Sequence, residues 1–253
     1  TVSRWLDPTS PERQEAEHQL PRTTGMSVQM LRHVLPLIFS EYTGKKLEQL
    51  CALELGTKDA LDSFVPMTSG HKKAVGPSLI INILAGNIPG AGLDSVLYSL
   101  IVKSATLVKA SSVENILPEI FIRSLRKVDP VLGSNVAVTT WPGGNQKLEE
   151  HTFGRADLVV ASGSVQSLSA IRKIAAQKLI GYGHKVSFSL IAKKEIAQVE
   201  ELARETAYDI ALFDQKGCLS PQVIYIIEGG SVTSGAFTEC LAERLRDWET
   251  LLP

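Results

Sequence analysis

The sequence predicts an α/β fold built on a parallel sheet with helices on both faces. From residue 78 onward, short apolar runs rich in β-branched residues alternate with longer amphipathic runs, and glycine or proline stands between them. Parallel strands need long crossover connections, which helices usually provide, so this alternation indicates a covered parallel sheet. The composition, with 44% hydrophobic and 21% charged residues in 253, is that of a globular protein with a substantial core.

The segment 1–75 is predicted to be helical. Its stretches MSVQMLRHVLPLIFSEY (26–42) and KKLEQLCALEL (45–55) space apolar residues three and four apart. Cys51 falls inside the second stretch, and Cys240 and His33 also fall on predicted helices. We expect all three side chains to serve packing rather than chemistry.

The alternation then runs through a series of predicted elements. Strands are expected in SLIINILA (78–85), ATLVKA (105–110), SNVAVTTW (134–141), ADLVVAS (156–162) and KVSFSLIA (185–192). Helices are expected in 93–104, 115–128, 166–177 and 195–207. A further strand candidate, QVIYIIE (222–228), indicates that a second α/β domain starts near residue 214.

Four stretches at predicted strand ends carry residues suited to a ligand: AGNIPGAG (85–92), VKASS (108–112), WPGG (141–144) and ASGS (161–164). Ligands of open parallel sheets bind at the carboxyl ends of the strands. Glycines there let the backbone approach a ligand and present N–H groups to anions, and Ser164 is placed to cap the next helix. Each stretch taken singly is equally consistent with an ordinary turn, but together the four favour a nucleotide.

Among these four strand-end stretches, the one that contains Lys109 says most about a ligand. It follows an apolar strand and precedes Ser111 and Ser112, so an ammonium and two hydroxyls meet at one strand end, which suits a ribose phosphate. A surface lysine followed by a serine cap is the alternative. We therefore divide the chain into a helical segment, 1–75, a nucleotide-binding α/β domain, 76–213, and the beginning of a catalytic domain, 214–253.

Cys218 lies in DQKGCLSP (214–221), where its neighbours are turn and surface residues rather than members of an apolar run. Most unpaired cysteines are small buried hydrophobes, so a thiol in a turn points to chemistry. His184, in YGHKVS (182–187), is either a buried structural histidine or an acid or base.

Composition excludes several classes of function. The formal net charge of −1 argues against a nucleic-acid binder, and three separated cysteines suggest neither a disulfide framework nor a metal site. No apolar run approaches the roughly 20 residues that span a membrane, so we expect a cytoplasmic protein. Because the chain starts at Thr1 and stops in a helical pattern, we also expect it to be a piece of a longer protein.

Taken in order, the strand-end stretches resemble the aldehyde dehydrogenase superfamily. Within it, YGHKVSFSLI (182–191) and DQKGCLSP are similar to the acyl-CoA and acyl-protein thioester reductases of the LuxC type. The resemblance covers about residues 78–230 and implies a Rossmann-like nucleotide-binding sheet followed by a second, truncated α/β domain. It also implies an NADPH-dependent reduction of a fatty acyl thioester to the aldehyde.

Carried over by position, the resemblance implies that Cys218 is the nucleophile and that the Asn87 amide helps to form an oxyanion hole. Lys109, Ser111 and Ser112 would meet the adenosine ribose. The residues that would line the adenine and pyrophosphate are Pro142, Gly143, Gly163 and Ser164. Ser112 stands where the superfamily often has a ribose-binding Glu, which removes a charge that would repel a 2′-phosphate and favours NADPH (NADP) over NADH.

One departure from the superfamily bears on the reaction. The general-base Glu of hydrolytic members corresponds here to Gly181, so water is poorly activated and an acyl group should pass to or from a thiol. His184 could supply a proton or act as the thiol base instead, but a structural role for it fits equally well.

Two other functions stay open. Cys218 could be a simple turn residue in a non-catalytic nucleotide-binding module, or the substrate could be an acyl phosphate, as in glutamyl phosphate reductase. The resemblance also leaves open an acyl-transferring partner protein and a homo-oligomer.

Overall fold

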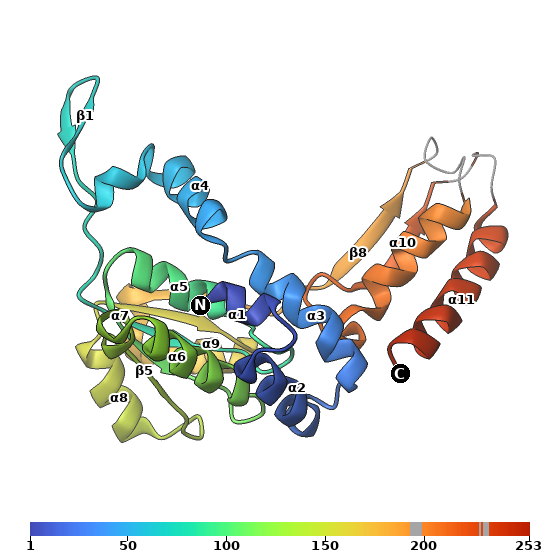
Figure 1. Cartoon of the computed structure of the whole chain (residues 1–253), viewed down its shortest axis with the longest axis horizontal. Coiled ribbons are helices and arrows are strands. Elements are labelled where there is room, and N and C mark those ends of the chain that lie inside the picture. Colours follow the sequence, from blue (N-terminus) through green and yellow to red (C-terminus); the bar gives the residue numbers. More distant parts are fainter. Residues whose placement is uncertain (193–198, 228, 230–232) are drawn as a thin grey trace. The chain divides into compact units, whose positions relative to one another are not determined.

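The computed structural model describes residues 1–192, 199–227, 229 and 233–253, and these divide into two compact units (Figure 1). The first unit comprises Thr1–Thr24 and Leu35–Gly183, and the second comprises Gly25–Val34 and His184–Pro253. This division differs from the predicted limits 1–75, 76–213 and 214–253, which remain a prediction about the domains of the whole protein. None of the helices in the described ranges is long and apolar enough to cross a membrane.

A five-stranded sheet organises the first unit. Its strand order is β5 (Val136–Thr139), β4 (Ala105–Lys109), β3 (Leu79–Ile83), β6 (Leu158–Ser162) and β7 (Leu179–Tyr182), and all neighbouring pairs are parallel. From β3 the chain first builds outward through β4 to β5, and then crosses to the other side of β3 for β6 and β7. The predicted parallel sheet is confirmed.

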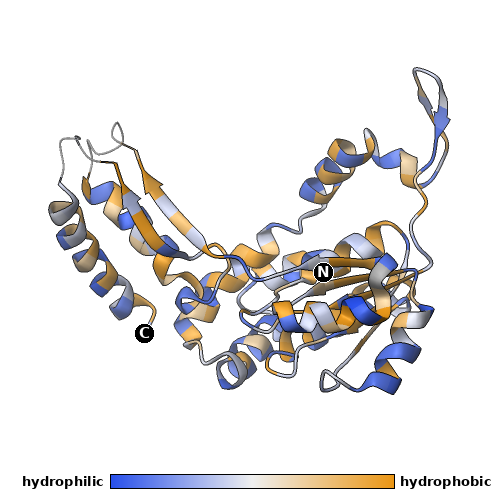
Figure 2. Ribbon diagram, turned by 180° about the vertical axis from the view of Figure 1, so that it is seen from behind, coloured by the Kyte–Doolittle hydropathy of each residue, from blue (hydrophilic) through white to orange (hydrophobic). Residues whose placement is uncertain are grey.

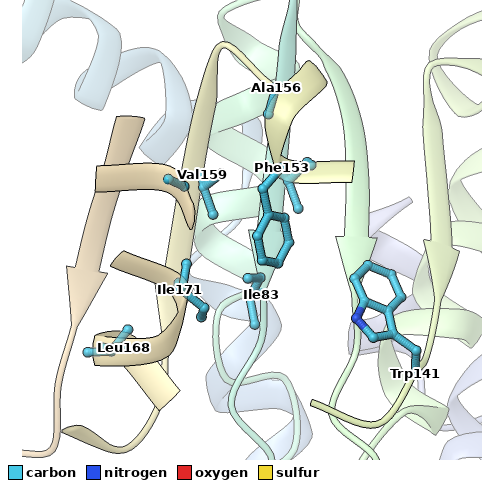
Figure 3. Packing of buried hydrophobic residues seen from close by; sticks show 10 residues of the cluster. Ile83, Trp141, Phe153, Ala156, Val159, Leu168 and Ile171 are labelled. Carbon is cyan, nitrogen blue, oxygen red and sulfur yellow. The ribbon is translucent and has the colours of Figure 1, made fainter. Parts of the chain in front are cut away.

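Helices cover both faces of this sheet, as predicted. On one face, α5 (Leu93–Ile101) meets β3, where Asn82 Nδ2 donates to Ser99 Oγ at 3.0 Å. On the other face, α8 (Gln146–Arg155) and α9 (Val165–Ala175) pack on alternate residues of the same strands. Figure 3 shows Phe153 and Ile171 against Ile83, with Trp141 at the margin of this cluster.

The N-terminal helices are α1 (Val2–Leu6), α2 (Pro11–Thr24), α3 (Val28–Ser40), α4 (Gly44–Leu55) and the 3₁₀ turn η1 (Lys58–Leu61). Trp5 stacks on Phe39 with ring centroids 4.2 Å apart and donates its Nε1–H to Ser124 Oγ at 3.1 Å. Since Ser124 lies on α6 (Ile116–Val128), this fully buried tryptophan joins the first helices to the sheet. Cys51 is buried, as predicted.

Several elements were not predicted. The antiparallel pair β1 (Val65–Met67) and β2 (Gly70–Lys72) falls inside the segment expected to be helical, and three-residue strands are too short for a periodic signal. Strand β7 has only four residues, three of them exposed, and lies at the sheet edge. Helices α7 (Pro130–Ser134) and α8 are short or largely polar.

The second unit has its own small sheet. Strand β8 (Ser187–Ile191) pairs in parallel with β9 (Pro221–Ile226). The predicted strand 185–192 is therefore present but does not join the five-stranded sheet. Figure 2 shows hydrophobic segments along both strands, and Ile191 belongs to the core that they form with α10 (Val199–Ala211) and α11 (Ser234–Leu251).

The helix predicted at 195–207 is found as α10 from Val199 to Ala211, while positions 195–198 lie outside the described residues, as does residue 228 of the predicted last strand. Cys240 on α11 packs against the core of this unit, as predicted. His33 Nε2 lies 3.1 Å from the Tyr208 hydroxyl, and both rings contact Trp248, which fixes the start of α3 to α10 and α11.

Glu114 fixes the loop that follows β3. Its side chain is 1% exposed, and Oε1 accepts a hydrogen bond from Leu117 N at 2.8 Å, while Gly90 and Ile116 also donate backbone N–H groups to the carboxyl group. This one side chain therefore joins the β3 loop to the start of α6. Burial raises the pKa of Glu114, and the backbone donors oppose that rise.

We predict that Glu114→Gln changes how stability depends on pH. A carboxyl group whose folded pKa is raised binds more protons when folded, so its contribution weakens folding as pH rises above about 4.5. Urea unfolding between pH 4.5 and 8 should show this decline in wild type and a flatter profile in Glu114→Gln. Glu119→Gln, at an exposed position of α6, the helix that Glu114 precedes, is the matched control, and an identical flattening there would contradict the assignment to Glu114.

Candidate functional site

The sheet register brings four of the sequence-predicted loops to one edge. Thr139, Lys109, Ile83, Ala161 and Gly181 form a single row across the five strands. All strands are parallel, so the chain leaves this row through the loops that begin after β3, β4, β5 and β6. The strand order reverses between β3 and β6, which is where ligands of such sheets bind.

The loops after β3 and β4 touch. An ideal Cβ built on Gly86 would overlap with the Ser111 side chain, so glycine allows this close approach. The Ser111 hydroxyl accepts a hydrogen bond from Val113 N at 3.1 Å, which turns the chain toward α6. Asn87 and Ser112 are exposed beside this contact. An exposed amide, Asn87, therefore directly follows the contact on one loop, and an exposed hydroxyl, Ser112, directly follows it on the other.

Lys109 is held over an aromatic ring. Its Nζ lies 5.2 Å from the centroid of the Trp141 ring, within the range of a cation–π interaction. Lys109 is half-buried, and burial lowers the pKa of its ammonium, while the negative charge of Glu149 acts in the opposite direction. Glu149 is buried and accepts a hydrogen bond from Gly144 N at 3.2 Å. A positive charge is thus fixed at the carboxyl edge of the sheet.

The turns after β5 and β6 contain small residues, and the backbone of the turn after β5 is exposed. Pro142 and Gly143 are exposed, and an ideal Cβ on Gly143 would meet nothing within 4 Å. Ser164 caps α9 as predicted, since its Oγ accepts from Ser167 N at 3.1 Å. Gly163 N donates to Tyr182 O at 3.1 Å, which ties this turn to the end of β7. These turns leave the space and the small residues that an anionic ligand needs.

Cys218 lies in the second unit, in the turn between η4 (Leu212–Gln215) and β9, and its side chain is exposed. The Ser187 hydroxyl donates to the Cys218 carbonyl at 2.5 Å. Gln215 Nε2 donates to the Pro221 carbonyl at 3.2 Å and so spans the turn. Because these bonds hold the backbone carbonyls of Cys218 and Pro221, the thiol is displayed on a pinned loop, that is, one whose backbone is fixed.

The backbone before this turn is left-handed at three successive positions. Phe213, Asp214 and Gln215 have φ values of 57°, 51° and 59°. Left-handed conformations outside glycine cost on the order of 1 kcal/mol each, and such strain gathers at functional sites. The strain is offset by local contacts, among them a hydrogen bond of 3.4 Å from the Ser220 hydroxyl to the Leu212 carbonyl.

His184 is exposed and precedes β8 by three residues, as Cys218 precedes β9. Ser187 and Pro221 are paired in register, so His184 and Cys218 lie at the same edge of the small sheet. His184 is therefore not the buried structural histidine that one interpretation of the sequence offered.

The predicted site residues thus fall in two groups. Asn87 and the expected cofactor residues belong to the first unit: Lys109, Ser111, Ser112, Pro142, Gly143, Gly163 and Ser164. Cys218 and His184 belong to the second. The sequence reasoning missed Trp141, Glu149 and Ser187. The buried aromatic position directly before the WPGG turn could have indicated Trp141, whereas Glu149 and Ser187 act through contacts that only the fold reveals.

Chemically, the first unit offers a cationic, glycine-rich strand edge suited to a dinucleotide, and the second offers an exposed thiol. No group of three His, Cys, Asp or Glu side chains that could hold a metal ion occurs in the described parts of the chain.

Solved structures share this fold. A benzaldehyde dehydrogenase described as NAD-dependent, from Corynebacterium glutamicum, matches with a TM-score of 0.70 at 15% identity, covering 97% of this chain and 53% of that one. A succinic semialdehyde dehydrogenase from Streptococcus pyogenes, solved with NADP⁺, matches with a TM-score of 0.68 at 13% identity, covering 97% and 52%. The predicted aldehyde dehydrogenase-like fold is confirmed.

Curated relatives are named long-chain acyl-protein thioester reductases. The protein of Photorhabdus laumondii is 28% identical over an alignment 205 positions long, which covers 79% of this chain and 42% of that protein. The protein of Vibrio harveyi is 26% identical over an alignment 259 positions long, which covers 100% of this chain and 53% of that protein. The chain therefore spans about half the length of these relatives.

The family model described as "Acyl-CoA reductase (LuxC)" matches residues 1–253, the entire chain. The chain belongs to the LuxC family of acyl-CoA reductases.

Proposed function

We propose that this chain forms the cofactor-binding and nucleophile-bearing part of an NADPH-dependent reductase that converts a fatty acyl thioester to the aldehyde. The observation that carries the proposal is the exposed Cys218 on its pinned turn, in a chain whose relatives are named acyl-protein thioester reductases. A thiol presented in this way is available to a substrate, whereas a structural cysteine is buried and inert.

The residues of the first unit fit NADPH. Gly143 leaves open space at the strand edge, and the glycine contact at Gly86 lets two loops approach each other closely. Lys109 provides a fixed positive charge, and Ser112 is exposed without adding a negative one. We place the adenosine half of the cofactor at Lys109, Ser111 and Ser112, and the adenine and pyrophosphate at Pro142, Gly143, Gly163 and Ser164. When bound, NADPH supplies the hydride for the reduction.

In the proposed reaction, the Cys218 thiolate attacks the thioester carbonyl carbon, the C–S bond to the leaving thiol breaks, and a new thioester forms on Cys218. The family resemblance assigns the stabilisation of the oxyanion during attack to Asn87 and the Cys218 N–H. His184 lies at the same sheet edge as Cys218 and is the candidate that takes up or delivers the proton of the thiol. Gly181 provides no base for water, which favours transfer between thiols.

The acyl donor is a fatty acyl-CoA or an acyl-protein, the latter delivered by an acyl-transferring partner protein. A homo-oligomer and a cytoplasmic location stay predictions of the sequence. An acyl phosphate as the substrate, and a nucleotide-binding module without catalysis, are the alternatives that the experiments below separate.

We predict that Cys218→Ala abolishes both turnover and acyl-enzyme formation, because no other thiol stands in this turn. The full-length protein is incubated with a long-chain acyl-CoA without NADPH, and intact mass reports the adduct, which should appear in wild type alone. Cys240→Ala is the control and should keep the adduct.

An adduct in Cys218→Ala would exclude Cys218 as the nucleophile, and NADPH binding without any adduct in wild type would favour the non-catalytic module. Reduction of acyl phosphate but not of acyl-CoA would favour the acyl-phosphate substrate.

Asn87→Ala should lower kcat by about 10²-fold without abolishing the reaction, which is the usual effect of losing one oxyanion donor. The side chain is exposed, so the fold should persist. Steady-state kinetics with acyl-CoA checks this, with Asn115→Ala on the β4–α6 connection as the matched control. Wild-type kcat in Asn87→Ala would remove Asn87 from the oxyanion hole.

Gly143→Ala should leave the fold unchanged but raise the Kd of NADPH by about tenfold, because a methyl group at this open position meets only the bound cofactor. Calorimetric titration measures the Kd. Gly154→Ala is the control, since its added Cβ also meets nothing within 4 Å and it lies on α8 near the start of β6, at the opposite edge. Equal Kd values for wild type and Gly143→Ala would place the cofactor elsewhere.

A further inference from the structure

Trp141 occupies a place that packing alone does not explain. The ring is 8% exposed and lies at the margin of the core cluster in Figure 3, directly before the turn that begins at Pro142. Its Nε1–H is buried and has no hydrogen-bond acceptor within the described residues. A buried donor without a partner costs on the order of 1–3 kcal/mol. A phenylalanine would fill the core margin without that cost, so the indole contributes something that its packing does not.

The ring face has a specific neighbour. Lys109 Nζ lies 5.2 Å from the ring centroid, and tryptophan is the aromatic residue that attracts a cation most strongly. Lys109 ends β4 and pairs in register with Thr139, two residues before Trp141. The lysine therefore comes from the end of β4 and the indole from the segment that directly follows the adjacent strand β5, and the ring can restrict the lysine side chain to one direction.

Glu149, on α8, is a charged group that acts on Lys109. Burial disfavours the ammonium and lowers its pKa, and Glu149 is the charged group that opposes this change. Glu149 is itself engaged, since its Oε1 accepts from Gly144 N at 3.2 Å and shapes the turn after Pro142. The ring face stabilises the ammonium without neutralising it, so Lys109 keeps its capacity to bind an anion.

We propose that Trp141 is a positioning residue for the cofactor, which holds the Lys109 ammonium toward the 2′-phosphate of NADPH and thereby favours NADPH over NADH. The inference rests on the proposed cofactor function and adds to it a residue that selects the phosphorylated ribose. Trp141 acts through Lys109 rather than by touching the phosphate.

The test uses two fragments of the cofactor, 2′,5′-ADP and 5′-AMP, titrated calorimetrically into the full-length protein. Trp141→Phe keeps a ring with a weaker negative face, and Trp141→Leu removes the ring. The affinity for 2′,5′-ADP should fall in the order Trp, Phe, Leu, by about threefold to thirtyfold in total, while the affinity for 5′-AMP changes little. Circular dichroism verifies that each variant is folded.

A double-mutant cycle separates positioning from structure. In a Lys109→Met background, Trp141→Phe should have no further effect on 2′,5′-ADP, because the lysine through which the ring acts is absent. An equal loss with and without Lys109 would overturn the proposal, as would unchanged 2′,5′-ADP binding in Trp141→Phe. Failure of wild type to bind either NADPH or 2′,5′-ADP would instead remove the proposed cofactor, and this inference with it.

Discussion

The parallel register of the five-stranded sheet is the constraint on which the proposed cofactor site depends. The row from Thr139 through Lys109 and Ile83 to Gly181 ends all five strands at one level. A shift of one residue in β4 would turn Lys109 to the opposite face, because side chains alternate along a strand. Alternate residues of β4 itself, Thr106 and Val108, are buried and make that shift costly. The hydrophobic core therefore determines where the lysine charge stands.

Much of this arrangement could be predicted from the sequence. The apolar runs around Ile81 and Val108 are short, β-branched and bounded by turn residues, and such runs identify buried parallel strands. Once the strands are known, their carboxyl ends must share one edge, so the loops at Gly86, Lys109 and Gly163 could be grouped without coordinates. The exposure of Cys218 followed from the turn residues around it.

What the sequence could not provide depends on contacts between distant segments. Strand β7 is short and mostly exposed, so it has too little apolar pattern to be distinguished from a loop. Strand β8 has a clear pattern, but nothing local states that its partner is β9. The cation–π contact joins residues 109 and 141, and the hydrogen bond from Ser187 to Cys218 joins residues 31 positions apart. Spacing within a strand or helix gives no information on such pairs.

In each unit, contacts with neighbouring residues hold one exposed or half-buried functional group, Lys109 in the first and Cys218 in the second. Lys109 is half-buried, which disfavours its charged form. The face of Trp141 and the negative charge of Glu149 both stabilise the ammonium there. At Cys218, an exposed thiol is presented on a defined backbone, where hydrogen bonds from Ser187 and Gln215 hold a turn that follows a left-handed segment. In both places, the residue that we propose to meet a ligand is held by neighbours to which no such role is assigned. Substitutions at those neighbours should therefore alter specificity or reactivity before they alter the fold.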